Sequence, residues 1–247
     1  VEDSCHALGG ATRDDGRRVP VGAATMSAAA CFSFHPVKTV AMGEGGAVTA
    51  RDPVLAERLR LLRSHGMTRD ATGFADVAQA FDTSGEPNPW YYEMAEPGFN
   101  YRASDLQCAL GASQLAKLGL FLGRRRALAA RYDHALAPLA PLVRPIPRGP
   151  TEDDGWHLYV VLIDFGACGQ TRAQVMERLR AAGIGTQVHY LPVHRQPHYR
   201  ALYPDLILPG ADAYYARCLS LPLFPDLGDE DVGRVVDALA EATGCGA

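Results

Sequence analysis

The sequence predicts an α/β protein, and three features support this prediction. A short apolar run at residues 29–34 is suited to a buried strand, and a second candidate strand, 47–50, follows a glycine-rich turn. Asp52 and Pro53 then open a helix, as its N-cap and first-turn proline. Further along, strands alternate with helices from residue 158 onwards, which is typical of a small α/β or α+β domain.

The middle of the chain predicts a loop followed by a long helix. Residues 64–99 show no clear periodicity, and a stretch of this length is often a binding loop or a partner contact. Ser104 and Gln107 have the spacing of a capping box, and the helix behind them is expected to continue past Tyr132. Such a helix is long enough to connect two domains.

The C-terminal part is expected to be a second folding unit. Five prolines between Pro138 and Pro150 break the preceding helix. The elements expected after them are a strand at 158–163, a helix capped by Thr171 and ended by Gly183, a strand at 184–190, a strand at 219–223 and a last helix from Asp229. The predicted organisation is therefore residues 1–115 in one domain, a connecting helix at 116–137 and a small domain at 138–247.

Composition narrows the class of function. Apolar residues make up 47% and charged residues 21%, and the net charge of -4 provides no basic surface for nucleic acid. No apolar run has the length of a membrane span. The six cysteines are scattered without a C-x-x-C pair, so we expect reduced thiols, no metal site and a cytoplasmic protein. The chain opens at Val1 as if a strand were already under way, which predicts a fragment.

Lysine is rare in this chain, and its positions are informative. Of 24 basic residues only Lys38 and Lys117 are lysine. Arginine stays protonated and cannot condense with an aldehyde, whereas lysine can lose its proton and do so. Lys117 falls in a long helical pattern, where a solvated side chain is the ordinary interpretation. Lys38 instead follows a predicted strand.

The segment from Ser33 to Lys38 leaves this strand and enters a turn. Pro36 fixes its own φ and biases His35 towards extended geometry, which helps to hold the turn. Ser33 and Lys38 can therefore face one site beyond the end of the strand, where a hydroxyl suits a phosphate and an amine suits an aldehyde. A serine and a lysine at this spacing are common, so the pair alone is a weak signal.

A longer set of motifs is more specific. Ser33-Phe-His-Pro-Val-Lys38, followed by Gly43-Glu-Gly-Gly46, resembles the cofactor-lysine segment of the DegT-type sugar aminotransferases. Val1-Glu-Asp-Ser-Cys-His-Ala-Leu-Gly9 resembles the strand that carries that family's cofactor aspartate, and Phe99-Asn-Tyr-Arg102 with Ser104 to Gly111 resembles a third block. The matches keep their order over nearly the whole chain. The resemblance implies fold type I of the pyridoxal-phosphate enzymes, with a partial large domain and a small C-terminal α/β domain.

The resemblance also implies a cofactor site for pyridoxal 5'-phosphate. Lys38 would hold the cofactor covalently, and Asp3 would pair with its protonated ring nitrogen and keep the ring an electron sink. His6 would contact the ring or its phenolic oxygen, where many relatives have glutamine. Ser33 would bind the phosphate, and Asn100 would reach the phosphate of a partner subunit, because family sites lie at a homodimer interface.

Each of these residues also has a structural interpretation. Asp3 can be a strand-end cap, His6 a hydrogen-bonded interior histidine and Asn100 a turn residue. His35 either shapes the turn or contacts substrate, and Arg102 is either a surface charge or a contact to substrate phosphate. Gly43 to Gly46 is better explained as a turn into the next strand than as a phosphate cradle, because no capped helix starts there.

Two further strings indicate a subgroup of the family. Arg63-Ser-His-Gly-Met-Thr68 and Gly183-Ile-Gly-Thr-Gln-Val-His-Tyr-Leu-Pro-Val-His194 are most similar to the aminotransferases of pseudaminic acid synthesis. The implied reaction moves an amino group from L-glutamate to C4 of a UDP-linked 4-keto-6-deoxy-N-acetyl hexose, with His189 and Tyr190 near the substrate. A GDP-perosamine synthase-like enzyme and a non-catalytic remnant of the fold remain as alternatives. Lys38 argues against the family's dehydratases, which have histidine in place of the lysine.

Overall fold

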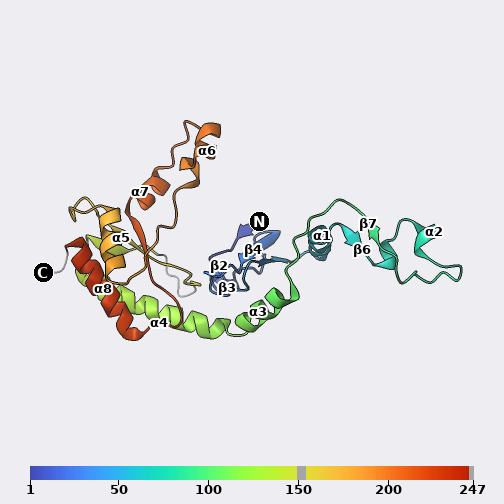
Figure 1. The fold of residues 1–247 in the computed structure, drawn as a ribbon, viewed down its shortest axis with the longest axis horizontal. Helices are drawn as coiled ribbons and strands as arrows, with labels where there is room; N and C mark the ends of the chain where they lie inside the picture. The colour runs from blue at the N-terminus through green and yellow to red at the C-terminus, as the bar shows by residue number, and fades with distance from the viewer. Residues whose placement is uncertain (149–153, 245–247) are drawn as a thin grey trace. The chain divides into compact units, whose positions relative to one another are not determined.

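A computed structural model describes residues 1–148 and 154–244 of the chain (Figure 1). The chain divides into two compact units, Val1–Ala116 and Lys117–Ala247, and each is described here by itself. Both contain a three-stranded sheet with helices, so the predicted α/β content is present in each unit.

The first unit is organised around the strand predicted at 29–34. β4 (Ala29–Ser33) lies between β1 (Glu2–Asp3) and β5 (Gly46–Ala50). β5 pairs with it in antiparallel register, and β1 pairs with it in parallel. Ala29, Ala30 and Phe32 are buried, which explains why this run is apolar. Both strand predictions, at 29–34 and 47–50, are confirmed to within one residue.

A hairpin that the sequence analysis missed follows β1. β2 (Ala11–Asp14) and β3 (Arg17–Pro20) pair in antiparallel register across a two-residue turn. Both turn residues have positive φ, 46° at Asp15 and 77° at Gly16, as a type I′ turn requires. The Asp-Gly dipeptide was the available signal.

The helix capped by Asp52 is α1 (Pro53–Arg63), whose first turn is closed by the Asp52 carboxylate accepting from the Val54 N–H. Short elements occupy the weakly periodic stretch that follows. They are β6 (Met67–Thr68), a 3-10 turn (Ala71–Gly73), α2 (Val77–Ala80) and β7 (Glu93–Met94). β6 pairs with β7, so this stretch contains a small ladder of its own.

The long helix predicted from Ser104 past Tyr132 is two helices, and that prediction was wrong in its continuity. α3 (Asp105–Leu115) begins at the expected capping box, and α4 (Leu118–Leu136) begins after a break at Ala116 and Lys117. Lys117 is the N-cap of α4 but makes no capping bond with its side chain. Leucines continue across the break, so the apolar pattern alone did not reveal it.

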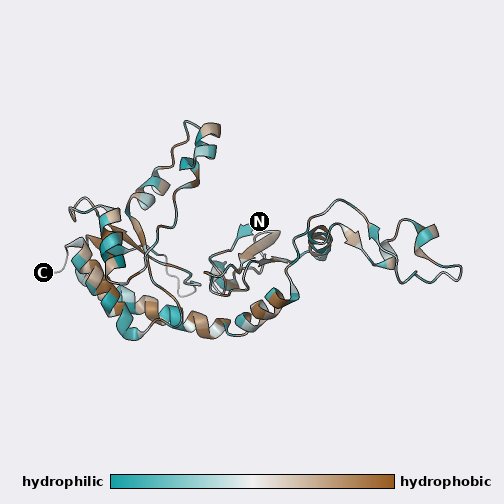
Figure 2. Cartoon of the chain, in the orientation of Figure 1, coloured by the Kyte–Doolittle hydropathy of each residue, from teal (hydrophilic) through white to brown (hydrophobic). Residues whose placement is uncertain are grey.

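The second unit has a sheet of three antiparallel strands, with β9 (Tyr159–Ile163) between β8 (Val143–Pro145) and β10 (Cys218–Leu221). A 3-10 turn (Ala137–Leu139) joins α4 to β8. α8 (Asp229–Thr243) packs against α4 and against α5 (Arg172–Ala181). Figure 2 shows β9 and β10 as largely hydrophobic and the helices as hydrophobic on part of their surface. The core they enclose includes Leu128, Tyr132, Val161, Leu179, Leu219 and Leu239.

The strand predicted at 184–190 does not form. Among these residues only Gln187 pairs with the sheet, through a single bridge to Ser220. The His189 ring bonds to the Ser220 side chain instead of continuing the ladder, and Pro192 follows closely. The chain then forms a 3-10 turn (Val193–Arg195), α6 (Pro197–Leu202) and α7 (Pro209–Arg217) before it returns to the sheet as β10.

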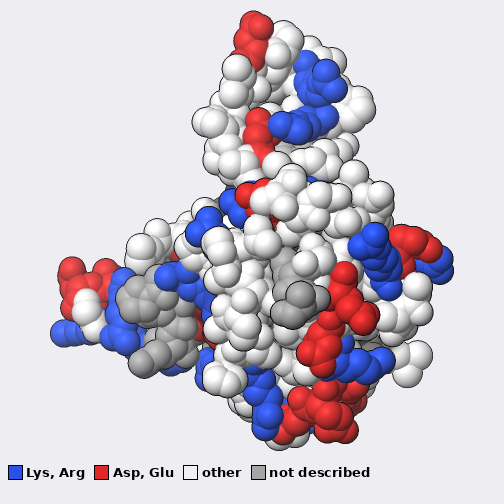
Figure 3. Space-filling model, turned by 90° about the vertical axis from the view of Figure 1, so that its left-hand side faces the viewer, with Lys and Arg blue, Asp and Glu red and all other residues white. Residues whose placement is uncertain are grey.

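Acidic and basic side chains both occur on the face shown in Figure 3. Within 1–148 and 154–244, no helix is both long and apolar enough to cross a bilayer. The same residues hold no cluster of three side chains that would suit a metal ion.

A core substitution tests the packing of the second unit. Leu239 on α8 is fully buried, so Leu239→Ala should lower the free energy of unfolding by about 2–5 kcal/mol. Leu120→Ala on α4 is the matched control, because Leu120 is 72% exposed and should change stability by less than about 0.5 kcal/mol. Urea unfolding followed by circular dichroism measures both. Equal losses in the two variants would contradict the packing described here.

Candidate active site

The candidate site is created by the parallel pairing of β1 with β4. Glu2 lies opposite Ala30 and Asp3 opposite Cys31, and the Ser4 N–H continues the ladder by donating to the Cys31 carbonyl at 2.9 Å. Carboxyl ends of parallel strands meet at the same edge of a sheet. Asp3 therefore lies beside the end of the strand from which Lys38 follows five residues after Ser33.

The Asp3 side chain is held as a carboxylate. Its pKa lies below the ordinary value chiefly because the side chain and the backbone N–H of Cys5 donate to it, the latter at 3.1 Å from Oδ1. The positive charges of His6 and Lys38 act in the same direction. In return, Asp3 raises the pKa of the Cys5 thiol, which keeps that thiol protonated. An anionic carboxylate thus lies within electrostatic reach of both predicted cofactor residues.

Lys38 closes a β-turn at the exit of β4. The Lys38 N–H donates to the His35 carbonyl at 2.9 Å, and Pro36 occupies the second turn position, which it favours. The Val37 N–H donates to His35 Nδ1 at 3.3 Å, and the Ser33 hydroxyl oxygen lies 3.5 Å from the His35 N. Ser33, His35 and Lys38 therefore lie in one hydrogen-bonded segment at the exit of β4.

The return strand fixes this turn from the other side. The Phe34 N–H donates to the Gly45 carbonyl at 2.9 Å and the Met42 N–H to the Phe34 carbonyl at 2.8 Å. At Gly46 a Cβ would lie only 2.3 Å from the Phe32 carbonyl oxygen, so a side chain cannot fit between β4 and β5. The glycine-rich segment is a turn into β5.

Asn100 and Arg102 lie elsewhere in the first unit. Asn100 forms a bridge with Ser64, and Arg102 Nη2 lies 3.2 Å from His65 Nε2. Both side chains are exposed. They alternate along the chain with Phe99 and Tyr101, whose rings stack on each other. The contacts of Asn100 with Ser64 and of Arg102 with His65 thus tie both residues to the end of α1.

His189 and Tyr190 lie in the second unit. His189 Nδ1 is 2.8 Å from the buried Ser220 hydroxyl, and the Tyr214 hydroxyl donates to the His189 carbonyl at 3.0 Å. These bonds fix the backbone beside Tyr190, whose side chain is more than half exposed. The exposed Tyr190 side chain therefore projects from a backbone that is held by the hydrogen bonds of His189.

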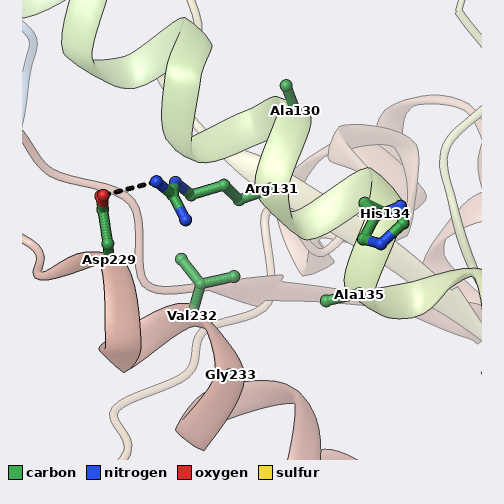
Figure 4. Close-up of a pocket in the computed structure, with 7 residues that line it drawn as sticks. All are labelled: Ala130, Arg131, His134, Ala135, Asp229, Val232 and Gly233. Atoms are coloured by element: carbon green, nitrogen blue, oxygen red, sulfur yellow. Dashed lines mark hydrogen bonds and ion pairs between the residues drawn. The ribbon is translucent and has the colours of Figure 1, made fainter.

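A hollow in the second unit is a different feature from the predicted site. It lies between α4 and α8, has a volume of about 580 Å³, and is lined in part by the ion pair of Arg131 with Asp229 at 2.5 Å (Figure 4). The rest is lined by Ala130, His134 and Ala135 of α4 and by Val232 and Gly233 of α8. It contains none of the predicted cofactor or substrate residues.

Three residues near Lys38 were not among the predicted site residues. Cys5 donates to Asp3, Glu44 Oε1 lies 3.6 Å from His35 Nε2, and Gln107 Nε2 donates to the Glu44 carbonyl at 2.7 Å. Glu44 is the one charged residue of a glycine-rich turn, which was a possible signal. The long-range contact of Gln107 had no signal in the sequence, because its capping role already explained it.

Comparison with known proteins identifies the family of this chain. A lysine in the turn beyond β4 and a carboxylate on the parallel neighbour β1 are side chains of the kind that aldehyde binding by a lysine requires. Residues 1–240 match the model of the DegT/DnrJ/EryC1/StrS aminotransferase family. The chain belongs to this family.

Solved structures of sugar aminotransferases share the fold. Helicobacter pylori PseC, an aminotransferase involved in pseudoaminic acid biosynthesis, is 30% identical, with a TM-score of 0.81 over 98% of this chain and 59% of its own. DesI, solved with its TDP-sugar product, is 32% identical, with a TM-score of 0.78 over 98% and 54%. The putative sugar aminotransferase Spr1654 from Streptococcus pneumoniae, in its PMP form, is 26% identical, with a TM-score of 0.79 over 98% and 56%.

These comparisons confirm the predicted family and fold class. The chain spans less than three fifths of the length of each of these three structures, so it represents part of the complete fold. The roles assigned to individual site residues remain predictions.

The close approach at Gly46 gives a test of how the site is built. Gly46→Ala should force β4 and β5 apart and lower the stability of the first unit by about 1–3 kcal/mol, because the Phe32 carbonyl cannot move without breaking the ladder. Gly73→Ala is the control, since a Cβ there meets nothing within 4 Å. Hydrogen exchange of the β4 amides measures the difference. Unchanged exchange in Gly46→Ala would show that the register is wrong.

Proposed function

We propose that the protein containing this chain is a pyridoxal-phosphate-dependent sugar-nucleotide aminotransferase, with Lys38 as its catalytic lysine. The observation that carries the proposal is the position of Lys38 and Asp3 at the same edge of one sheet, with Asp3 held ionised. Family membership and the neighbouring aminotransferase structures support it.

The side chains present suit the cofactor. The Asp3 carboxylate is anionic, as a partner of a protonated pyridine nitrogen must be, and the Cys5 donors keep it so. Ser33 supplies a hydroxyl for the phosphate and His6 lies near enough to Asp3 to affect its charge. Solved PLP and PMP forms of Spr1654 show that a relative takes up this cofactor. When bound, pyridoxal phosphate supplies an electron sink for bonds at the amino-bearing carbon.

Lys38 performs the proton transfers in this proposal. With pyridoxal phosphate bound, the free amine of Lys38 would accept the proton that leaves the glutamate Cα. In the second half-reaction the same amine would deliver a proton to C4 of the sugar. A turn closed by the Lys38 N–H keeps the backbone fixed while the long side chain moves between these positions.

Four of the predicted site residues do not lie at the sheet edge of Asp3 and Lys38. They are proposed to contact the substrate or to act in the site of a partner subunit. Asn100 and Arg102 face solvent beside the end of α1, so they are accessible to a second subunit or to a substrate phosphate. His189 and Tyr190 belong to a backbone fixed by Ser220 and Tyr214, and we propose that they contact the sugar nucleotide.

The proposed substrate is a UDP-linked 4-keto-6-deoxy-N-acetyl hexose. The likeness to PseC, an aminotransferase of pseudoaminic acid biosynthesis, supports this sugar class. A TDP-linked ketosugar is the second candidate, because DesI is equally similar and was solved with a TDP-sugar product. Both candidate substrates would undergo the same reaction. They differ in the nucleotide base that the enzyme must recognise.

A coupled glutamate assay on the full-length protein tests the substrate proposal. UDP-linked ketosugar should be aminated with a kcat/KM at least about tenfold above that for the TDP- and GDP-linked forms, corresponding to roughly one well-made hydrogen-bond contact. Lys38→Arg should abolish turnover and Lys117→Arg should leave it near wild type, since both changes preserve charge. Turnover that survives Lys38→Arg would eliminate the proposed mechanism.

Subunit complementation tests the proposed sharing of sites. Lys38→Ala and Asn100→Ala should each be nearly inactive alone. If Asn100 acts in the partner's site, co-expression should restore about a quarter of the wild-type sites, because half of the dimers are mixed and each mixed dimer has one intact site. Absence of any restoration would place Asn100 in the same subunit's site or outside it.

A further inference from the structure

We infer that His35 is a positioning residue, whose ring braces the turn that carries Lys38. This inference rests on the proposed function of Lys38. It adds a residue that holds the backbone of the Lys38 turn in position. Sequence alone left His35 between shaping the turn and contacting substrate.

The His35 ring and backbone both accept bonds from the turn. The His35 carbonyl accepts from the Lys38 N–H at 2.9 Å, and its Nδ1 accepts from the Val37 N–H at 3.3 Å. A backbone N–H can only donate, so Nδ1 must carry its lone pair there and the ring proton must be on Nε2. His35 thus satisfies two consecutive amides of a turn in which Pro36 has none to give.

The other side of the ring faces the return loop. Nε2 lies 3.6 Å from Glu44 Oε1, which is an electrostatic contact and too long for a hydrogen bond. Glu44 is largely exposed, so this contact contributes little by itself. It places a carboxylate on the Nε2 side of the ring.

The return loop is itself anchored to α3. Gln107 Nε2 donates to the Glu44 carbonyl at 2.7 Å, while Gln107 Oε1 accepts from the Ser104 N–H at 2.9 Å in the capping box. Gly111 on the next turn of α3 approaches Met42, where a Cβ would lie 3.2 Å from the Met42 side chain. The start of α3 therefore fixes the position of the loop that contains Glu44. Because His35 contacts Glu44 and also accepts the hydrogen bonds of the Lys38 turn, it links this loop to the turn.

Two isosteric substitutions separate the two sides of the ring. Asparagine places an oxygen where Nδ1 lies and can accept from the N–H two residues on, as Asn commonly does in turns before proline. Glutamine places an amide near Nε2 but leaves the Val37 N–H without its acceptor. His35→Asn should therefore preserve the brace, whereas His35→Gln and His35→Ala should lose it. Glu44→Gln is the control for the minor contact.

The test compares these variants in the full-length protein by two measurements. Residue-resolved hydrogen exchange, recorded without cofactor, should show the Val37 and Lys38 amides exchanging about two- to tenfold faster in His35→Gln and His35→Ala, the loss expected for one hydrogen bond. Reductive labelling of Lys38 with pyridoxal phosphate should slow in the same two variants. His35→Asn and Glu44→Gln should resemble wild type in both.

Two results would overturn the inference. Identical amide exchange in all variants would show that the ring does not brace the turn. Labelling impaired equally in His35→Asn and His35→Ala would assign His35 a role that its Nδ1 acceptor does not explain, such as direct contact with the cofactor. If Lys38 takes up no label even in wild type, the proposed function fails, and the exchange data still decide the role of His35.

Discussion

The pairing of β1 with β4 is the contact on which the candidate site depends. It is short, with only Glu2 and Asp3 in register, yet it brings together residues that are 35 positions apart in the chain. Its parallel direction places Asp3 at the edge where β4 ends, and the turn beyond β4 presents Lys38. Without this register the carboxylate and the amine would have no reason to lie within reach of each other's charge.

Much of this arrangement could be predicted from the sequence, because local chemistry determines it. The apolar run of β4, the cap at Asp52 and the capping box at Ser104 each depend on residues only a few positions apart. The turn at Pro36 is of the same kind. The cofactor aspartate was accessible only through the family resemblance, since a carboxylate at a strand end is usually a simple cap.

Other features escaped prediction because they depend on distant residues or on a competing signal. Leucines recur on both sides of the break between α3 and α4, so the apolar pattern gave no sign of the break. Residues 184–190 have the composition of a strand, but His189 bonds to the Ser220 side chain and the ladder ends at Gln187. The contact of Gln107 with the Glu44 loop joins segments 63 positions apart. Contacts of this kind form only in the folded chain, and no local sequence pattern predicts them.

In the proposed function, the Lys38 amine is the group that joins covalently to the cofactor aldehyde. The most direct measurement is borohydride reduction of the full-length protein with pyridoxal phosphate, followed by peptide mapping by mass spectrometry. The account predicts one reduced adduct on the peptide that contains Lys38 and none on the peptide that contains Lys117, the only other lysine of the chain. An adduct at Lys117, or no adduct at either lysine, would contradict it.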